Sequence, residues 1–195
     1  LQIGDGVSTQ NTSVITNGFN CQFQAGGGLL SLGNLTVDAP NGAERFMNVS
    51  SNNVNSGTVP AGYNFNVQNN FTITAGSVFN KILGNAPVYV GGNIINNGTL
   101  NMPRGGNLYL GNIINGALTP SAIPQTISGS GTYLANEYNL NGSNLYNAHS
   151  VGSLTVNNTS AAGVTIGVPN FRVNGVSLTN GIVHTTATNT IYCGA

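Results

Sequence analysis

The stretch Val90-Gly91-Gly92-Asn93-Ile94-Ile95-Asn96-Asn97-Gly98 is followed closely by a near copy, Leu110-Gly111-Asn112-Ile113-Ile114-Asn115-Gly116. The two copies lie 19 residues apart, counted from Ile94 to Ile113. Each copy has a Gly-Asn step, two branched apolar residues and an Asn-Gly step, which is typical of a short strand between two turns. Recurrence at such an interval predicts stacked coils, each of which buries its apolar side against its neighbours.

The rest of the chain uses the same vocabulary of short apolar runs and turns. Weaker echoes of the unit are Asn34-Leu35-Thr36-Val37, Asn70-Phe71-Thr72-Ile73 and Ser153-Leu154-Thr155-Val156. The gaps between runs are too short for crossover helices, which indicates an all-β class. We therefore predict a single-domain β-solenoid (parallel β-helix) over residues 1–195, with about ten coils of about 19–20 residues and asparagine ladders at the corners. A β-sandwich fibre subunit is the alternative architecture.

One segment interrupts this pattern. Residues 38–62 contain Pro40, Pro60 and a polar stretch, and we predict a loop excursion from the coil there. The chain begins at Leu1 without a basic segment and an apolar core, so either a signal was removed or the chain is a fragment of a longer one.

The charge content restricts the classes of partner. The chain has four Lys or Arg, four Asp or Glu and no net charge, and only 4% of its residues are charged, against about a quarter in an average soluble domain. Without a basic field, nucleic-acid binding is not expected. No apolar stretch approaches the ~20 residues of a membrane helix, so we predict a protein that does not span a membrane.

Residues for catalysis or metal binding are sparse. The two histidines, His149 and His184, lie in a polar turn and a strand pattern, and neither is close to other metal ligands. Asp38 and Glu44 are the only close carboxylates, and the adjacent Arg45 favours a surface ion pair over a glycosidase pair. No nucleophile motif or phosphate-binding loop is present. We predict a protein that is not an enzyme, with no catalytic residues, no metal and no cofactor.

Two cysteines, Cys21 and Cys193, lie almost at opposite ends of the sequence. In an extended solenoid they would be ~45 Å apart at ~4.8 Å per coil, so a disulfide would have to join two stacked subunits. A disulfide within one chain would instead indicate a compact sandwich. Both pairings, and two free thiols, stay open at this point.

Four tyrosines are the candidate aromatic contacts for a glycan: Tyr109, Tyr133, Tyr138 and Tyr146. The simpler interpretation is that they fill strand positions, because tyrosine favours strands.

The last third of the chain carries a more specific signal. It contains Gln125-Thr126-Ile127-Ser128-Gly129-Ser130-Gly131-Thr132-Tyr133, Leu154-Thr155-Val156-Asn157-Asn158, Gly163-Val164-Thr165-Ile166, Val173-Asn174-Gly175-Val176-Ser177-Leu178-Thr179-Asn180-Gly181-Ile182-Val183 and Thr186-Ala187-Thr188-Asn189-Thr190-Ile191. These phrases resemble the repeat region of Bacteroidetes cell-surface and secreted proteins, which are adhesin-like β-solenoid stalks exported by the type IX route. No C-terminal sorting domain of that family is visible.

The resemblance implies a secreted, extracellular or surface-anchored structural protein. Together with the repeat and the scarcity of charge, it leads us to expect a non-enzymatic, adhesin-like protein that stacks or self-associates through its β-rich ends into a filament or stalk. Glycans are the other expected partner. Two alternatives are a carbohydrate-binding or polysaccharide-degrading β-helix protein, and a fibre subunit joined by donor-strand exchange.

Overall fold

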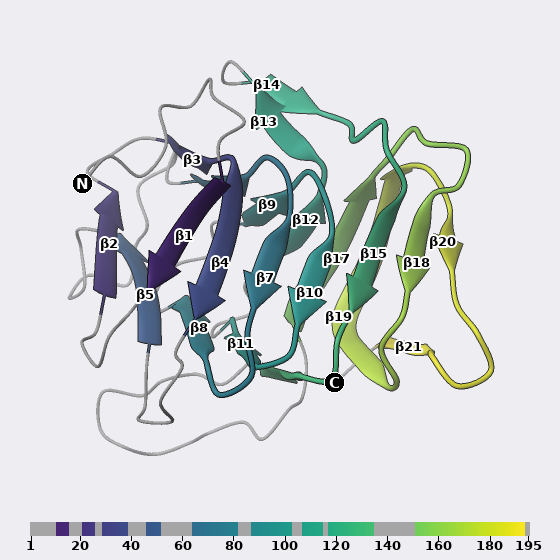
Figure 1. Ribbon diagram of the computed structural model, residues 1–195. Coiled ribbons are helices and arrows are strands. Elements are labelled where there is room, and N and C mark those ends of the chain that lie inside the picture. The colour runs from purple at the N-terminus through teal and green to yellow at the C-terminus, as the bar shows by residue number, and fades with distance from the viewer. Residues whose placement is uncertain are drawn as a thin grey trace.

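The fold consists of parallel sheets. The computed structural model describes residues 11–15, 21–25, 29–38, 46–51, 64–81, 87–102, 107–114, 117–134 and 151–193. Their strands form three parallel sheets and one antiparallel pair, and none of these residues lies in a helix (Figure 1). The all-β class predicted from the sequence is therefore confirmed, with parallel pairing throughout the three sheets.

We name the sheets A, B and C. Sheet A has the order β1 (Asn11–Ile15), β4 (Asn34–Asp38), β7 (Phe71–Ile73), β10 (Ile94–Asn96), β15 (Gln125–Ser128), β18 (Val164–Ile166), β20 (Val183–His184). Sheet B has the order β2 (Cys21–Ala25), β5 (Phe46–Ser51), β8 (Val78–Lys81), β11 (Thr99–Asn101), β16 (Thr132–Leu134). Sheet C has the order β3 (Leu29–Leu32), β6 (Asn64–Val67), β9 (Val88–Val90), β12 (Leu108–Leu110), β17 (Val151–Asn157), β19 (Phe171–Asn180), β21 (Ile191–Cys193). The antiparallel pair is β13 (Asn112–Ile114) with β14 (Ala117–Thr119).

The chain visits the sheets in rotation. Five times it passes from A to B to C and returns to A, and in the last two passages it goes from A (β18, β20) to C (β19, β21) without a described strand in B. We call each passage that begins in sheet A a circuit. Each strand pairs in parallel with the strand of the same sheet in the next circuit, as the neighbouring arrows in Figure 1 show. A Greek-key sandwich has antiparallel neighbours, so this pairing does not fit the alternative architecture.

The core consists of apolar side chains stacked in columns along the sheets. In sheet C one column reads Leu32, Val67, Val90, Leu110 and Val156, and all five side chains are fully buried. In sheet A the corresponding column reads Leu35, Phe71, Ile94, Ile127 and Ile166, and is buried in the same way. Burial of every second residue in these strands agrees with the period of two of a half-buried strand.

Asparagines link the circuits at the N-terminal ends of the strands of sheet A. The Asn34 Oδ1 accepts a hydrogen bond from the backbone N–H of Asn70, at 3.0 Å. The Asn70 Oδ1 in turn accepts from the N–H of Asn93, at 2.9 Å, and the Asn93 Oδ1 accepts from the N–H of Thr126, at 2.9 Å. The sequence-based expectation of an asparagine ladder is confirmed at these positions.

The echo units occupy two different sheets. Asn34-Leu35-Thr36-Val37 and Asn70-Phe71-Thr72-Ile73 stack directly on each other in sheet A, with Leu35 opposite Phe71. The third echo, Ser153-Leu154-Thr155-Val156, lies in β17 of sheet C. The same four-residue pattern therefore forms strands in both sheet A and sheet C, because strands of both sheets bury every second side chain.

The two copies of the long phrase do not stack on each other, which corrects the 19-residue interval. Ile94 pairs with Phe71 and Ile127 in sheet A, whereas Ile113 pairs with Leu118 in the β13–β14 hairpin. The reason is local: Asn115 and Gly116 connect these strands, and Asn-Gly is the dipeptide most favoured in two-residue hairpins.

The hairpin is attached to the face of sheet C opposite the core. Asn66 lies between Phe65 and Val67 in β6, so its side chain points to the opposite face of the sheet, and it is fully buried there. Its Nδ2 donates to Ser31 Oγ at 2.8 Å and to the Ile113 carbonyl at 3.1 Å, and its Oδ1 accepts from the Ile113 N–H at 3.2 Å. Side-chain bonds thus take the place of a ladder between β6 and β13.

Circuits are longer and fewer than the repeat predicts. Within sheet A the interval between paired residues ranges from 19 positions, Val164 to Val183, to 39 positions, Gln125 to Val164. The described residues supply seven strands to sheet A and seven to sheet C, rather than about ten. Within the expected excursion at 38–62, Phe46–Ser51 forms β5 and pairs with β2 and β8. Residues 39–45 and 52–62 of that range lie outside the described residues.

Candidate functional site

The strand β19 has one fully paired side and one partly paired side. β17 pairs with β19 as far as Asn180, whereas β21 pairs only with residues 171–173. In the part of the chain that the structure describes, residues 175–180 therefore have an open edge. Backbone N–H and C=O groups on an open edge are available to a further strand.

Apolar side chains at core positions are exposed on this same stretch. Leu178 continues the column of Val156, and Val176 continues the column of Leu154. Leu154 and Val156 are fully buried, but Val176 is 37% exposed and Leu178 is 56% exposed. These two residues are apolar and lie in the core columns, but no later strand among the described residues covers them.

Sheet A ends in a similar way at β20. Ile182 is exposed, and the next residue, Val183, is only partly buried against the core. Val183 pairs with Val164, which is fully buried one circuit earlier. We call Val176, Leu178, Ile182 and Val183 the end surface.

The opposite end of the stack differs. The column that finishes at Leu178 starts at Leu32 in β3, the last strand of sheet C at that end. Leu32 is fully buried, and Ser31 beside it is also buried. Of the two ends of this column, only the one at β19 exposes its apolar residue.

Tyr109 packs against a second tyrosine and accepts a hydrogen bond. Its ring lies against that of Tyr89, with 4.9 Å between the ring centroids. Its hydroxyl accepts a hydrogen bond from Asn157 Nδ2 at 3.0 Å. Burial, with a smaller contribution from the adjacent Tyr109, raises the pKa of Tyr89 above its ordinary value. The Tyr89–Tyr109 contact thus joins the neighbouring strands β9 and β12 of sheet C.

Tyr133 is a buried residue of sheet B. It is 8% exposed, and its ring meets that of Phe171 edge to face at a centroid distance of 5.1 Å. Its hydroxyl is buried and has no hydrogen-bond partner. The Asn96 amide nearby is bonded to the Thr132 carbonyl and the Gly98 N–H. Burial raises the pKa of Tyr133 strongly, and the Asn96 amide offsets only part of this rise.

The other two tyrosines predicted as glycan contacts, Tyr138 and Tyr146, lie outside the described residues. The structure therefore does not bring the four tyrosines together in one described site. Tyr109 and Tyr133 themselves belong to sheets C and B, respectively.

The cysteines lie at opposite ends of the stack. Cys21 is in β2, the edge strand of sheet B at one end, and Cys193 is in β21, the edge strand of sheet C at the other (Figure 1). Six inter-strand steps separate the first and last strands of sheet C, which corresponds to roughly 29 Å at ~4.8 Å per step. Cys193 is an exposed free thiol, and this separation is far beyond the reach of a disulfide within one chain.

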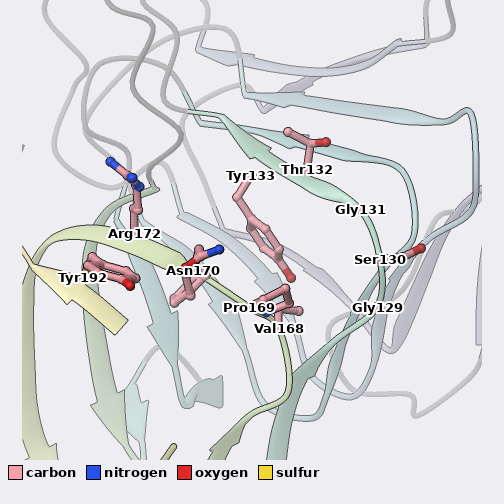
Figure 2. Close-up of a pocket in the computed structure, with 11 residues that line it drawn as sticks. Gly129, Ser130, Gly131, Thr132, Tyr133, Val168, Pro169, Asn170, Arg172 and Tyr192 are labelled. Atoms are coloured by element: carbon pink, nitrogen blue, oxygen red, sulfur yellow. The ribbon is translucent and has the colours of Figure 1, made fainter. Parts of the chain in front are cut away.

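A hollow beside β16 contains residues that the sequence pattern did not single out. Its volume is about 770 Å³, and Tyr133, Arg172 and Tyr192 are among the residues that line it (Figure 2). The guanidinium of Arg172 lies over the ring of Tyr192, 5.7 Å from the centroid. Parallel pairing places these two residues opposite each other in β19 and β21. Only this register, which the sequence does not reveal, brings them together.

The described residues lack both a cluster of metal ligands and a long apolar helix. No group of three or more His, Cys, Asp or Glu residues there is arranged to hold a metal ion. No helix in this part of the chain is long and apolar enough to cross a membrane.

Comparisons with protein-family models, with curated proteins and with solved structures found no match.

Proposed function

We propose that the chain is a β-solenoid that serves as a non-enzymatic structural module and self-associates through its end surface. The solenoid is supported by the rotation of the chain through sheets A, B and C and by the parallel register between successive circuits. The buried columns and the asparagine ladder are repeated from circuit to circuit over β4, β7 and β10 of sheet A. Repeats of this kind are stable only when neighbours cover their apolar faces.

The observation that carries the proposal is the contrast within one column. Leu32, Val67, Val90, Leu110 and Val156 are fully buried, and the next residue, Leu178, is 56% exposed. Fully burying a leucine side chain contributes about 1.5–3 kcal/mol, and covering the exposed part of Leu178 would contribute roughly half of that. The adjacent backbone edge of residues 175–180 offers hydrogen bonds to the covering strand.

A second copy of the chain is the occupant that we propose for this edge. Two β19 edges related by a two-fold axis would pair antiparallel and cover each other's Val176 and Leu178, which is the self-complementary arrangement of an isologous dimer. Charge does not oppose the contact, because the chain has no net charge. A filament would need a second contact at the β3 end, where Leu32 is buried.

A secreted or cell-surface location is part of the same proposal. Its support is the resemblance of the last third of the chain to extracellular β-solenoid repeats. The phrases that carry it fall in strands β15 to β21, which include the end surface. Location on a cell could be tested by antibody labelling of intact cells compared with lysed cells.

Analytical ultracentrifugation of the whole chain tests the assembly. We expect a concentration-dependent dimer for the wild type and a monomer for Leu178→Lys, because a buried ammonium has no partner in the interface. The matched control is Leu118→Lys on the β14 hairpin strand, where the leucine is 57% exposed. It should dimerise like the wild type. A wild type that stays monomeric at millimolar concentration, or an equal effect of both variants, contradicts the proposal.

A further inference from the structure

Sheet B stops two circuits earlier than sheets A and C, since it has five strands and each of the others has seven. After β18 the chain passes through residues 167–170 directly into β19 of sheet C, without a described strand in sheet B. The hollow of about 770 Å³ lies beside β16, where such a strand would otherwise pack. It is therefore a groove produced by the topology, between the last strand of sheet B and the turn that replaces the next one.

The groove has an apolar floor and a polar rim. Tyr133, Val168 and Phe171 are buried. Ser130 and Asn170 are exposed on the rim. Figure 2 shows Ser130 and Asn170 on different sides of the Tyr133 ring. Short hydroxyl and amide groups around an aromatic floor can bond to the hydroxyls of a sugar.

One full charge lies at this rim. Arg172 is exposed, and its contact with Tyr192 uses the face of the tyrosine ring. Among the described residues, Asp38 in β4 of sheet A is the one carboxylate side chain, and it accepts a hydrogen bond from Thr74. No described carboxylate pairs with the guanidinium, whose planar fork of N–H donors suits a carboxylate of a ligand.

We propose that this groove binds a sugar unit that carries a carboxylate, such as a uronic acid within an acidic polysaccharide. Arg172 pairs with the carboxylate, and Tyr192 holds the guanidinium in place by the cation–π contact. Asn170, Thr132 and Ser130 bond to the sugar hydroxyls. The buried hydroxyl of Tyr133 takes no part, because it lies beneath the surface of the groove.

An acidic peptide is the competing ligand, since β16 is an edge strand and could pair with an extended chain. The sugar is favoured because β16 offers only three residues of edge, whereas the rim offers several hydroxyl and amide groups around a single charge. The inference does not depend on the end surface, whose four residues do not line the groove.

Calorimetric titration of the whole chain tests the inference. The probes are trimers of galacturonate, glucuronate and mannuronate, each with its neutral counterpart, and a short aspartate-containing peptide. We expect at least one acidic trimer to bind at least tenfold more tightly than its neutral counterpart. Arg172→Gln should abolish this preference, and Arg172→Lys should retain part of it because the charge remains.

Three further variants separate a site from a general charge effect. Tyr192→Leu should weaken binding several-fold, whereas Tyr192→Phe should bind like the wild type because the ring is kept. Lys81→Gln removes one positive charge from β8 and should have no effect. Equal binding of acidic and neutral trimers, binding of no trimer at millimolar concentration, or Arg172-dependent binding of the peptide alone would overturn the inference.

Discussion

At the scale of the residue, asparagine side chains add hydrogen bonds between circuits to those of the parallel backbone ladders. At the surface, the Oδ1 atoms of Asn34, Asn70 and Asn93 each accept a backbone N–H of the following circuit. In the interior, Asn158 is fully buried, and its Nδ2 donates to the Ile123 carbonyl and to Gln125 Oε1 at 2.9 Å. The abundance of asparagine is therefore a structural requirement, because buried backbone groups need partners.

Removal of the interior amide should be costly. Gln125 Nε2 donates to the carbonyls of Val90 and Gly92, so Asn158 completes a network that crosses circuits. We expect Asn158→Ala to lower the free energy of unfolding by about 2–4 kcal/mol, because it leaves the buried Gln125 Oε1 unpaired and breaks the network between circuits. Urea denaturation measures this, with the exposed Asn174→Ala as the control, for which a change below about 0.5 kcal/mol is expected. Equal losses in both variants would contradict the network.

Tyr133 gives a prediction of the opposite sign. Because its buried hydroxyl lacks a partner, Tyr133→Phe should raise the free energy of unfolding by about 1 kcal/mol at neutral pH. Loss of stability in the phenylalanine variant at neutral pH would mean that the hydroxyl has a partner.

The same residue should make stability depend on alkaline pH. The pKa of Tyr133 in the folded state is raised above the ordinary value of 10.0, so the folded state favours the protonated phenol more than the unfolded state does. Below about pH 10 both states are protonated and this group costs no stability through titration. As the pH rises above about 10 the unfolded state loses its proton first, and the free energy of unfolding falls. Thermal unfolding at pH 8 and pH 11 measures the effect, and the decrease should be smaller in Tyr133→Phe. An identical decrease in both proteins would assign the effect to other groups.

Candidate site residues were the hardest to predict from the sequence. Residue type alone points to the four tyrosines. Of the two that are described, Tyr109 accepts a hydrogen bond from Asn157, and Tyr133 packs on Phe171 and lines the groove. Arg172 and Tyr192 lie 20 positions apart and meet only through the register of β19 and β21. The type of each side chain can be read from the sequence. Its neighbours in the next circuit depend on the length of that circuit, and this length cannot be read from the sequence.

At the scale of the element, glycines allow the corners of neighbouring circuits to approach closely. A Cβ on Gly129 would lie 2.1 Å from the Asn96 carbonyl oxygen, and one on Gly131 would lie 2.4 Å from that of Gly98. Both contacts are to backbone of the preceding circuit, which cannot move without shifting the sheets. Gly129 also has a φ of +107°, a conformation that L-residues avoid.

We expect Gly129→Ala to lower the free energy of unfolding by about 2 kcal/mol or more, through both the backbone clash and the positive φ. The matched control is Gly175→Ala in β19, where a Cβ would meet nothing within 4 Å. That variant should be neutral or slightly more stable, because alanine loses less conformational entropy than glycine. Denaturation midpoints compare the two, and similar values would contradict the close approach.

The elements also show where sequence patterns are ambiguous. Alternation correctly predicted strands around Leu35 and Leu154, because a period of two is enforced by burial on one side. The two copies of the Gly-Asn-Ile-Ile-Asn phrase predict one repeating position, yet they form a core strand and a hairpin strand. What differs is the next few residues, which either continue to sheet B or reverse the chain.

At the scale of the whole molecule, the sequence supported the broad class and the order along the stack. The all-β class and the position of the two cysteines at opposite ends follow from short runs and from a chain that advances in one direction. The number of circuits did not follow, because their length varies from 19 to 39 positions even within sheet A. Irregular connections leave the buried columns intact, since only the strands need to match.

The asparagine ladder has a consequence for the environments in which this protein can work. Links between circuits that rest on amides carry no charge, so dissolved ions do not screen them. Amides also do not titrate, unlike the carboxylates that form ion pairs in most proteins. With four basic and four acidic residues in 195, the stack should hold equally well in fresh water and in brine.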